Sequence, residues 1–174
     1  MIRLATAADL PQVAEIYEAV LDHEAETGVV YTNWQKGAYP TADTARSIFE
    51  EGTLYVAEDE DGVIYGTMNL NGKQLPEYVN VPWSIAADDA QVAVIHTLAI
   101  HPDYFGRHLA REMIAWAEAE ARRQGKTAMR FDTWENNVPA NHLYPLLGYR
   151  FAGATEFFFM GYTREILNLY EKAL

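Results

Sequence analysis

The sequence contains no cysteine among its 174 residues. This absence excludes disulfide bonds, zinc sites with cysteine ligands and catalysis by a thiol nucleophile. The chain also lacks an apolar run close to the ~20 residues that a membrane-spanning helix requires. Its first residues, MIRLATAADL, show no apolar core of a signal peptide. We therefore expect a cytoplasmic protein with no membrane partner.

Basic residues are scarce, because 13 Lys and Arg stand against 25 Asp and Glu, a formal net charge of −12. Non-specific binding to nucleic acid depends largely on neutralising phosphates, so we expect no nucleic-acid partner and a preference for cationic partners. The alternative is that the acidity serves only solubility. Residues 101–130 differ from the rest, with six basic against four acidic residues, and could accept an anion.

Apolar periodicity predicts a single domain over residues 1–174 with a mixed α/β sheet and helices on its faces. The expected strands are 2–4, 53–58, 63–70, 92–100, 128–133 and a final strand pair, although the last piece, EILNLYEKAL, also fits a helix by periodicity alone. The expected helices follow Thr6 and Thr41, open after residue 108 and cover residues 139–147. Thr6 and Asp9 resemble a capping box.

Residues 104–111, YFGRHLAR, form an acid-free turn between a predicted strand and a predicted helix. The first turn of a helix presents free N–H groups and the positive end of the helix dipole, and phosphate commonly binds there. Gly106 would let the backbone approach such a ligand closely. Taken alone, the same residues also fit simple turn chemistry.

Two stretches of the sequence resemble the motifs of one family. VIHTLAIHPDYFGRHLAREMI is similar to the acetyl-CoA-binding motif of the GCN5-related N-acetyltransferase (GNAT) family, in which a loop of the form Arg/Gln-x-x-Gly-x-Gly/Ala opens a helix. Downstream, NVPANHLYPLLGYRFAG resembles the later motif, with the family spacing at Asn137, Ala140, Tyr144, Gly148 and Tyr149. The resemblance is specific over residues 92–152 and vaguer over 1–71. It departs at Phe105, where the family has Arg or Gln, and at His108, where it has Gly.

The resemblance implies the GNAT-like acyl-CoA N-acyltransferase fold, a central and mostly antiparallel sheet with a splayed strand pair and helices on both faces. It also implies acetyl-CoA as the cofactor and transfer of its acetyl group to a primary amine. The cofactor-binding residues that it assigns are Leu98, Ala99, Ile100, Phe105, Gly106, Arg107, His108, Leu109, Ala110, Arg111, Asn137 and Tyr144. A Cβ at position 108 would crowd the pyrophosphate, and the alternative is that a protonated His108 adds positive charge there. In either case we expect an altered cofactor affinity rather than a different cofactor.

His96 is the candidate general base. It lies two residues before Leu98, where many family members carry Glu, and an imidazole titrates near pH ~6.5. The alternative is a buried structural histidine, and Glu24, Glu26 and Asp132 are competing candidates for the base.

Tyr144 matches the family's usual partner of the leaving thiolate. A phenol has a pKa of ~10 and a thiol ~8.5, so a hydrogen bond is expected rather than complete proton transfer. The alternative is a tyrosine that only packs its helix. Asn137 either contacts the cofactor or caps that same helix.

The acceptor is expected to be a small cationic molecule that meets aromatic and acidic side chains of the N-terminal half. The predicted acceptor wall comprises Tyr31, Trp34, Tyr39 and Trp83, with Glu24, Glu26 and Asp132 nearby. The alternative is that these rings pack in the core and loops. Without cysteine, direct attack on acetyl-CoA is expected, and the histidine spacing predicts no metal site.

Two classes of function stay open on the sequence: an active N-acetyltransferase, and a non-catalytic acyl-CoA-binding or protein-interaction module on the same scaffold. A homodimer is left open as well.

Overall fold

The computed structural model describes residues 1–159, 161 and 163–174. Contacts within this part of the chain define two compact units, which are called unit 1 (Met1–Leu70 with Ile95–Ala117) and unit 2 (Asn71–Val94 with Glu118–Leu174). Across the described residues, seven strands follow the hydrogen-bonded order β1-β2-β3-β4-β5-β7-β6. This is the mixed α/β architecture predicted from the sequence. No helix in the described ranges is long and apolar enough to cross a membrane.

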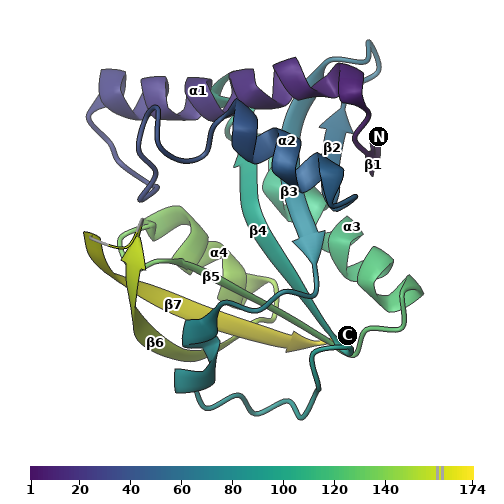
Figure 1. Cartoon of the computed structure of the whole chain (residues 1–174), viewed down its shortest axis with the longest axis vertical. Coiled ribbons are helices and arrows are strands. Elements are labelled where there is room, and N and C mark those ends of the chain that lie inside the picture. Colours follow the sequence, from purple (N-terminus) through teal and green to yellow (C-terminus); the bar gives the residue numbers. More distant parts are fainter. Residues whose placement is uncertain (160, 162) are drawn as a thin grey trace. The chain divides into compact units, whose positions relative to one another are not determined.

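Unit 1 contains the N-terminal strands and helices (Figure 1). Its elements are β1 (Ile2–Leu4), α1 (Leu10–Thr27), α2 (Ala42–Glu50), β2 (Leu54–Glu58) and most of β3 (Ile64–Asn71), joined by the second part of β4 (Val92–Ile100) and the first part of α3 (Leu109–Arg123). β1 pairs antiparallel with β2, and β2 with β3. Thr41 caps α2 as predicted, because its hydroxyl accepts a hydrogen bond from the Thr44 amide at 3.3 Å.

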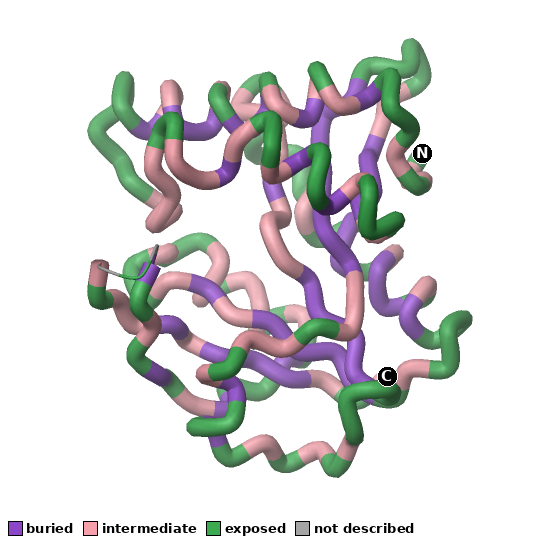
Figure 2. Tube along the Cα trace, viewed as in Figure 1, coloured by how far each residue is buried: buried purple, intermediate pink, exposed green. Residues whose placement is uncertain are grey.

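The strands of unit 1 carry apolar residues on both faces because helices cover both faces. Leu54 and Val56 belong to a buried cluster with residues of α1 and α2. Tyr55, which lies between them and points to the other face, has its ring centroid 5.1 Å from that of Trp116 in α3. β2 and β3 therefore run almost continuously buried in Figure 2, and for unit 1 the predicted helices on both faces are confirmed.

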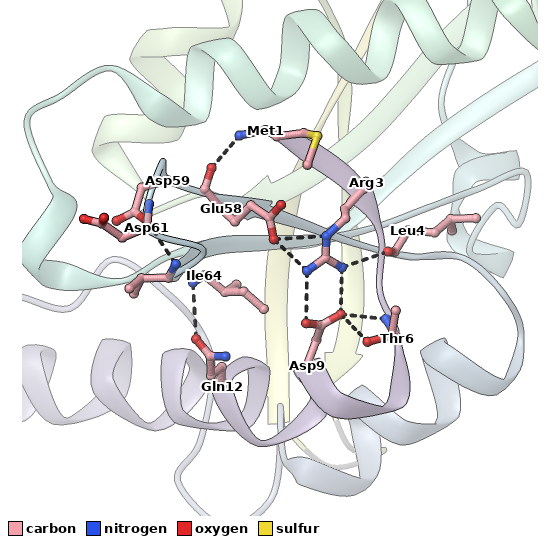
Figure 3. Close-up of polar contacts among 11 residues, drawn as sticks. Met1, Arg3, Leu4, Thr6, Asp9, Gln12, Glu58, Asp59, Asp61 and Ile64 are labelled. Carbon is pink, nitrogen blue, oxygen red and sulfur yellow. Dashed lines mark hydrogen bonds and ion pairs between the residues drawn. The ribbon is translucent and has the colours of Figure 1, made fainter.

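An ion-pair cluster joins β1, β2 and the turn before α1 (Figure 3). The Arg3 guanidinium donates to both carboxylate oxygens of Asp9, at 2.8 and 3.1 Å, and its Nε donates to Glu58 at 3.0 Å. The Thr6 amide donates to Asp9 at 2.6 Å, so the predicted pairing of these two residues is present. The hydrogen bonds from Arg3 hold the pKa of Asp9 at about 2, below its ordinary 3.8.

Unit 2 contains the C-terminal strands. Its elements are the first part of β4, the end of α3, β5 (Ala128–Trp134), α4 (Val138–Leu146), β6 (Arg150–Phe159) and β7 (Thr163–Ala173). β7 pairs antiparallel with β5 and β6, so the last segment is a strand and not the alternative helix. β4 pairs parallel with β5 through residues 92–94 and 128–130, the first three of each strand.

Two buried carboxylates anchor unit 2. Glu171 in β7 accepts hydrogen bonds from the Ser84 amide at 2.8 Å, the Ser84 hydroxyl at 2.7 Å and the Arg150 Nε at 3.2 Å. Glu118 in α3 accepts hydrogen bonds from the Lys172 ammonium at 2.8 Å and the Tyr149 phenol at 2.9 Å. These contacts attach the irregular segment 72–90 and the end of α3 to the C-terminal strands.

Candidate active site

The predicted cofactor loop lies in unit 1, between the end of β4 and the start of α3. A short 3-10 turn, Pro102–Tyr104, leads into it, and residues 105–108 are exposed. Gly106 has φ 78° and His108 has φ 61°, so both adopt the left-handed conformation. A residue with a Cβ pays about 1–2 kcal/mol for that conformation. His108 therefore adopts a conformation that glycine, the residue expected here from the family resemblance, would adopt without this cost.

The start of α3 fits a diphosphate. Leu109 and Ala110 occupy the first turn, where N–H groups lack partners inside the helix. No carboxylate occurs within residues 104–111, and Arg107 and Arg111 add positive charge. His108, in place of the glycine expected from the family resemblance, adds a side chain at this turn. It leaves the backbone amides at the start of α3 in place.

Neighbouring side chains attach this loop to the rest of unit 1. The ring centroid of Phe105 lies 5.4 Å from that of His23 in α1. The Arg107 guanidinium lies 4.8 Å from the Tyr104 ring centroid and donates to the Asp103 carbonyl at 3.2 Å. Tyr104 in turn donates to Asp59 at 2.9 Å. Phe105 thus makes an aromatic contact where the family usually has a polar side chain.

The predicted thioester-binding residues 98–100 complete β4. Leu98 and Ile100 are half-buried, whereas Ala99 is buried in the cluster with α1 and α2. His96, the predicted base, is half-buried on the same strand. Between His96 and Leu98, Thr97 has φ 50°, which is an outlier for a β-branched residue. Sequence analysis missed this feature, because threonine inside an apolar run predicts ordinary extended strand.

Thr97 is hydrogen-bonded to the aromatic loop that follows α1. The Tyr39 phenol and the Thr97 hydroxyl lie 2.6 Å apart. The ring of Trp34 contacts that of Tyr39 at 6.4 Å and that of Tyr17 at 6.1 Å between centroids. Two members of the predicted acceptor wall, Trp34 and Tyr39, therefore lie together in unit 1.

Tyr17 of α1 joins this aromatic group. Its side chain is fully buried. Within the described ranges its hydroxyl makes no hydrogen bond of ordinary geometry, and the Thr67 side chain is its polar neighbour. Burial, and secondly the nearby Tyr39, raises the pKa of this phenol, so it is neutral at physiological pH. A buried polar atom without such a hydrogen bond is unusual, and no sequence pattern signals it.

Glu24, a predicted competitor for the base, is buried and holds the aromatic loop. Its carboxylate accepts hydrogen bonds from the amides of Tyr31 and Thr32, each at 2.8 Å, and from the Thr32 hydroxyl at 3.1 Å. These contacts favour a structural role for Glu24. Glu26 lies exposed near the end of α1.

The other predicted site residues belong to unit 2. The ring of Tyr144 lies 4.3 Å from that of Phe131 and 5.2 Å from that of Tyr170. Burial, followed by the charge of Asp132, raises the pKa of the Tyr144 phenol. The carboxylate of Asp132 accepts a hydrogen bond from the buried Tyr78 at 2.8 Å.

Asn137 and Trp83 have structural contacts of their own. The Asn137 side chain accepts a hydrogen bond from the Ala140 amide at 3.1 Å, so it caps α4, and its contact with the cofactor stays a prediction. The Trp83 ring lies 4.3 Å from the Arg130 guanidinium, and its Nε1 donates to the Tyr78 carbonyl at 2.8 Å. Packing therefore accounts for much of the Trp83 surface.

Comparisons with known proteins identify the family of this chain. The family model described as "Acetyltransferase (GNAT) family" matches residues 14–149. The chain is 29% identical over 154 residues to the L-amino acid N-acyltransferase MnaT of Escherichia coli (strain K12), covering 85% of this chain and 78% of the relative.

Solved structures share the fold. A GNAT-family acetyltransferase from Listeria monocytogenes 4b F2365 matches with a TM-score of 0.76 at 21% identity, over 100% of this chain and 94% of that chain. The protein yncA from Salmonella typhimurium, solved with its cofactor acetyl-CoA, matches with a TM-score of 0.70 at 21% identity, over 99% and 92% of the two chains. With the family model covering most of its length, this chain belongs to the GNAT family of acetyltransferases.

Proposed function

We propose that this acetyl-CoA-dependent N-acetyltransferase passes the acetyl group directly to the primary amine of a small cationic acceptor. Family membership gives the reaction and the cofactor, and decides for an enzyme over a non-catalytic binding module. The observation that carries the proposal is the left-handed conformation of His108 ahead of α3. In this conformation the altered residue still leads the backbone of the cofactor loop into the first turn of the helix. The acidic N-terminal half and the rings of Trp34 and Tyr39 support a cationic acceptor.

The residues that would hold acetyl-CoA follow from this loop. The amides of Leu109 and Ala110, with Arg107 and Arg111, would bind the diphosphate. Backbone N–H groups of residues 98–100 would donate to the thioester oxygen, where negative charge develops. Bound acetyl-CoA supplies an activated acetyl group, and the chain's own residues orient the amine and move the protons.

His96 would accept the proton that the acceptor's ammonium must lose before it can attack. The Tyr144 phenol would donate a hydrogen bond to the departing sulfur. Because its pKa is raised, the phenol keeps its proton at neutral pH and complete transfer to a thiolate is unfavourable. We expect His96→Ala and Tyr144→Phe each to slow turnover while coenzyme A binding stays largely intact. Unchanged rates in both variants would remove these roles.

The acceptor is tested by measuring free thiol released from acetyl-CoA with polyamines, aminoglycosides and amino acids. Turnover confined to cationic amines supports the proposal, and turnover confined to neutral or anionic amines contradicts it. A second candidate acceptor is an L-amino acid of any net charge, favoured by the similarity to MnaT. Equal rates with lysine, alanine and glutamate would select that second candidate.

A further inference from the structure

We infer that Tyr39 is a positioning residue for acetyl transfer, whose phenol holds Thr97 in its left-handed conformation and thereby orients the reacting part of β4. The inference rests on the proposed function, which assigns His96 and the amides of residues 98–100 to the reaction. Tyr39 acts here through Thr97 and not by touching the acetyl group.

The first step of the argument is the backbone of β4. Thr97 has φ 50° although it lies inside the strand Val92–Ile100. A side chain branched at Cβ disfavours this conformation strongly, so surrounding contacts must maintain it. The 2.6 Å hydrogen bond between the Thr97 hydroxyl and the Tyr39 phenol is such a contact.

The second step is the position of Thr97 in the chain. In a regular strand successive residues alternate between the two faces, and a left-handed residue interrupts this alternation and turns the next peptide. The residue before Thr97 is the predicted base, and the residue after it begins the predicted thioester-binding amides. Relaxation of Thr97 to the extended conformation would therefore redirect both groups at once.

The third step is the rigidity of the partner. Tyr39 is fixed through its ring contact with Trp34, which packs against the buried Tyr17. The carboxylate of Glu24 holds the same loop by its backbone at Tyr31 and Thr32. One hydrogen bond thus joins the loop of the predicted acceptor wall to the strand of the predicted base, across 58 residues of sequence.

The test begins with Tyr39→Phe, which removes the hydroxyl and keeps the ring. We expect kcat to fall about 10- to 100-fold, as for a small misplacement of reacting groups, while the Kd for coenzyme A stays unchanged. The matched control is Tyr65→Phe, which removes another phenol hydroxyl of unit 1 and should leave kcat unchanged. An unchanged kcat in Tyr39→Phe overturns the inference.

A rescue variant separates positioning from direct contact with the acceptor. Glycine adopts the left-handed conformation freely, so Thr97→Gly should restore most of the rate lost in Tyr39→Phe. Thr97→Val replaces the hydroxyl with a methyl group and keeps the branched shape. It should lower kcat as much as Tyr39→Phe, without further loss in the double variant. Failure of the rescue, or losses that multiply, would mean that the phenol acts on the acceptor itself.

Folding and the proposed function are controlled separately. If Tyr39→Phe does not fold, Thr97→Ser and Thr97→Val replace it, because only serine keeps the hydroxyl; equal kcat values in these two overturn the inference. If the parent protein releases no thiol with any amine, the proposed function fails and the inference fails with it. If the parent is active and the rescue is absent, only the inference fails.

Discussion

Glu171 in unit 2 and Tyr17 in unit 1 are both fully buried, yet their polar atoms have different surroundings. The Glu171 carboxylate accepts hydrogen bonds from Ser84 and Arg150. In the part of the chain that the structure describes, the Tyr17 hydroxyl lies near the Thr67 side chain but makes no hydrogen bond of ordinary geometry. Close to Tyr17 lies Tyr39, whose phenol meets the left-handed Thr97.

The difference shows that burial alone does not decide whether a polar group in this fold has hydrogen-bond partners. In unit 2 the carboxylates of Glu171 and Glu118 have several partners, whereas Glu77 Oε2 and Arg130 Nε are buried with none among the described residues. In unit 1 an outlying backbone conformation and a phenol without an ordinary hydrogen bond occur beside the residues predicted to react. Strain of this kind tends to occur at functional sites, where the surrounding structure maintains it.

The largest expected change in stability follows from removing the Glu171 carboxylate, which accepts several hydrogen bonds in unit 2. Glu171→Ala should lower the free energy of unfolding by about 3–5 kcal/mol, because it leaves the buried Arg130 guanidinium and the Ser84 amide without this carboxylate. Chemical denaturation measures the change, with the exposed Glu15→Ala as control. A loss no greater than in the control would show that the network adds little stability.

Asp9 gives a second test of the comparison, because it belongs to unit 1 and its carboxylate accepts hydrogen bonds from Arg3 and Thr6. Its pKa is about 2 when folded and near 3.8 otherwise, so its contribution is complete above pH ~5 and disappears as the pH falls towards 2. We expect up to about 2 kcal/mol of stability to be lost over this range. Asp9→Asn should flatten that part of the pH profile, and an identical profile would contradict the assignment.

The hydroxyl groups of two buried tyrosines, Tyr149 in unit 2 and Tyr17 in unit 1, allow a direct comparison of the two units. Tyr149→Phe should cost about 1–2 kcal/mol, because it removes a hydrogen bond to the Glu118 carboxylate. Tyr17→Phe should cost less, because within the described ranges its hydroxyl makes no hydrogen bond of ordinary geometry and has only the Thr67 side chain as a polar neighbour. Thermal unfolding of both variants measures the difference. Equal destabilisation would mean that the Tyr17 hydroxyl makes a hydrogen bond of full strength, for example to a buried water.

The smallest effect is expected at His108. Glycine removes the cost of the left-handed conformation in the folded state, but it also increases the conformational entropy of the unfolded chain. Because these two contributions oppose each other, His108→Gly should change the free energy of unfolding by less than about 1 kcal/mol. Removal of the Cβ should at the same time tighten coenzyme A binding several-fold, which calorimetry measures. Weaker binding would show that the imidazole assists the cofactor.

Local signals made much of this structure predictable from the sequence. The strand and loop over residues 92–111, the cap at Thr41 and the pairing of Thr6 with Asp9 involve residues close together in the chain. The contacts of Glu24 and Thr97 could not be predicted in this way. The first needs a loop folded back on its own helix, and the second depends on a residue 58 positions away.

The packing of Trp34 between Tyr17 and Tyr39 also gives the protein a built-in optical reporter. Light absorbed by the two phenols should pass to the indole between them, so ultraviolet excitation of tyrosine would appear as Trp34 emission. With the other three tryptophans replaced by phenylalanine, that emission would report the arrangement of the aromatic loop while an amine binds, without any attached dye.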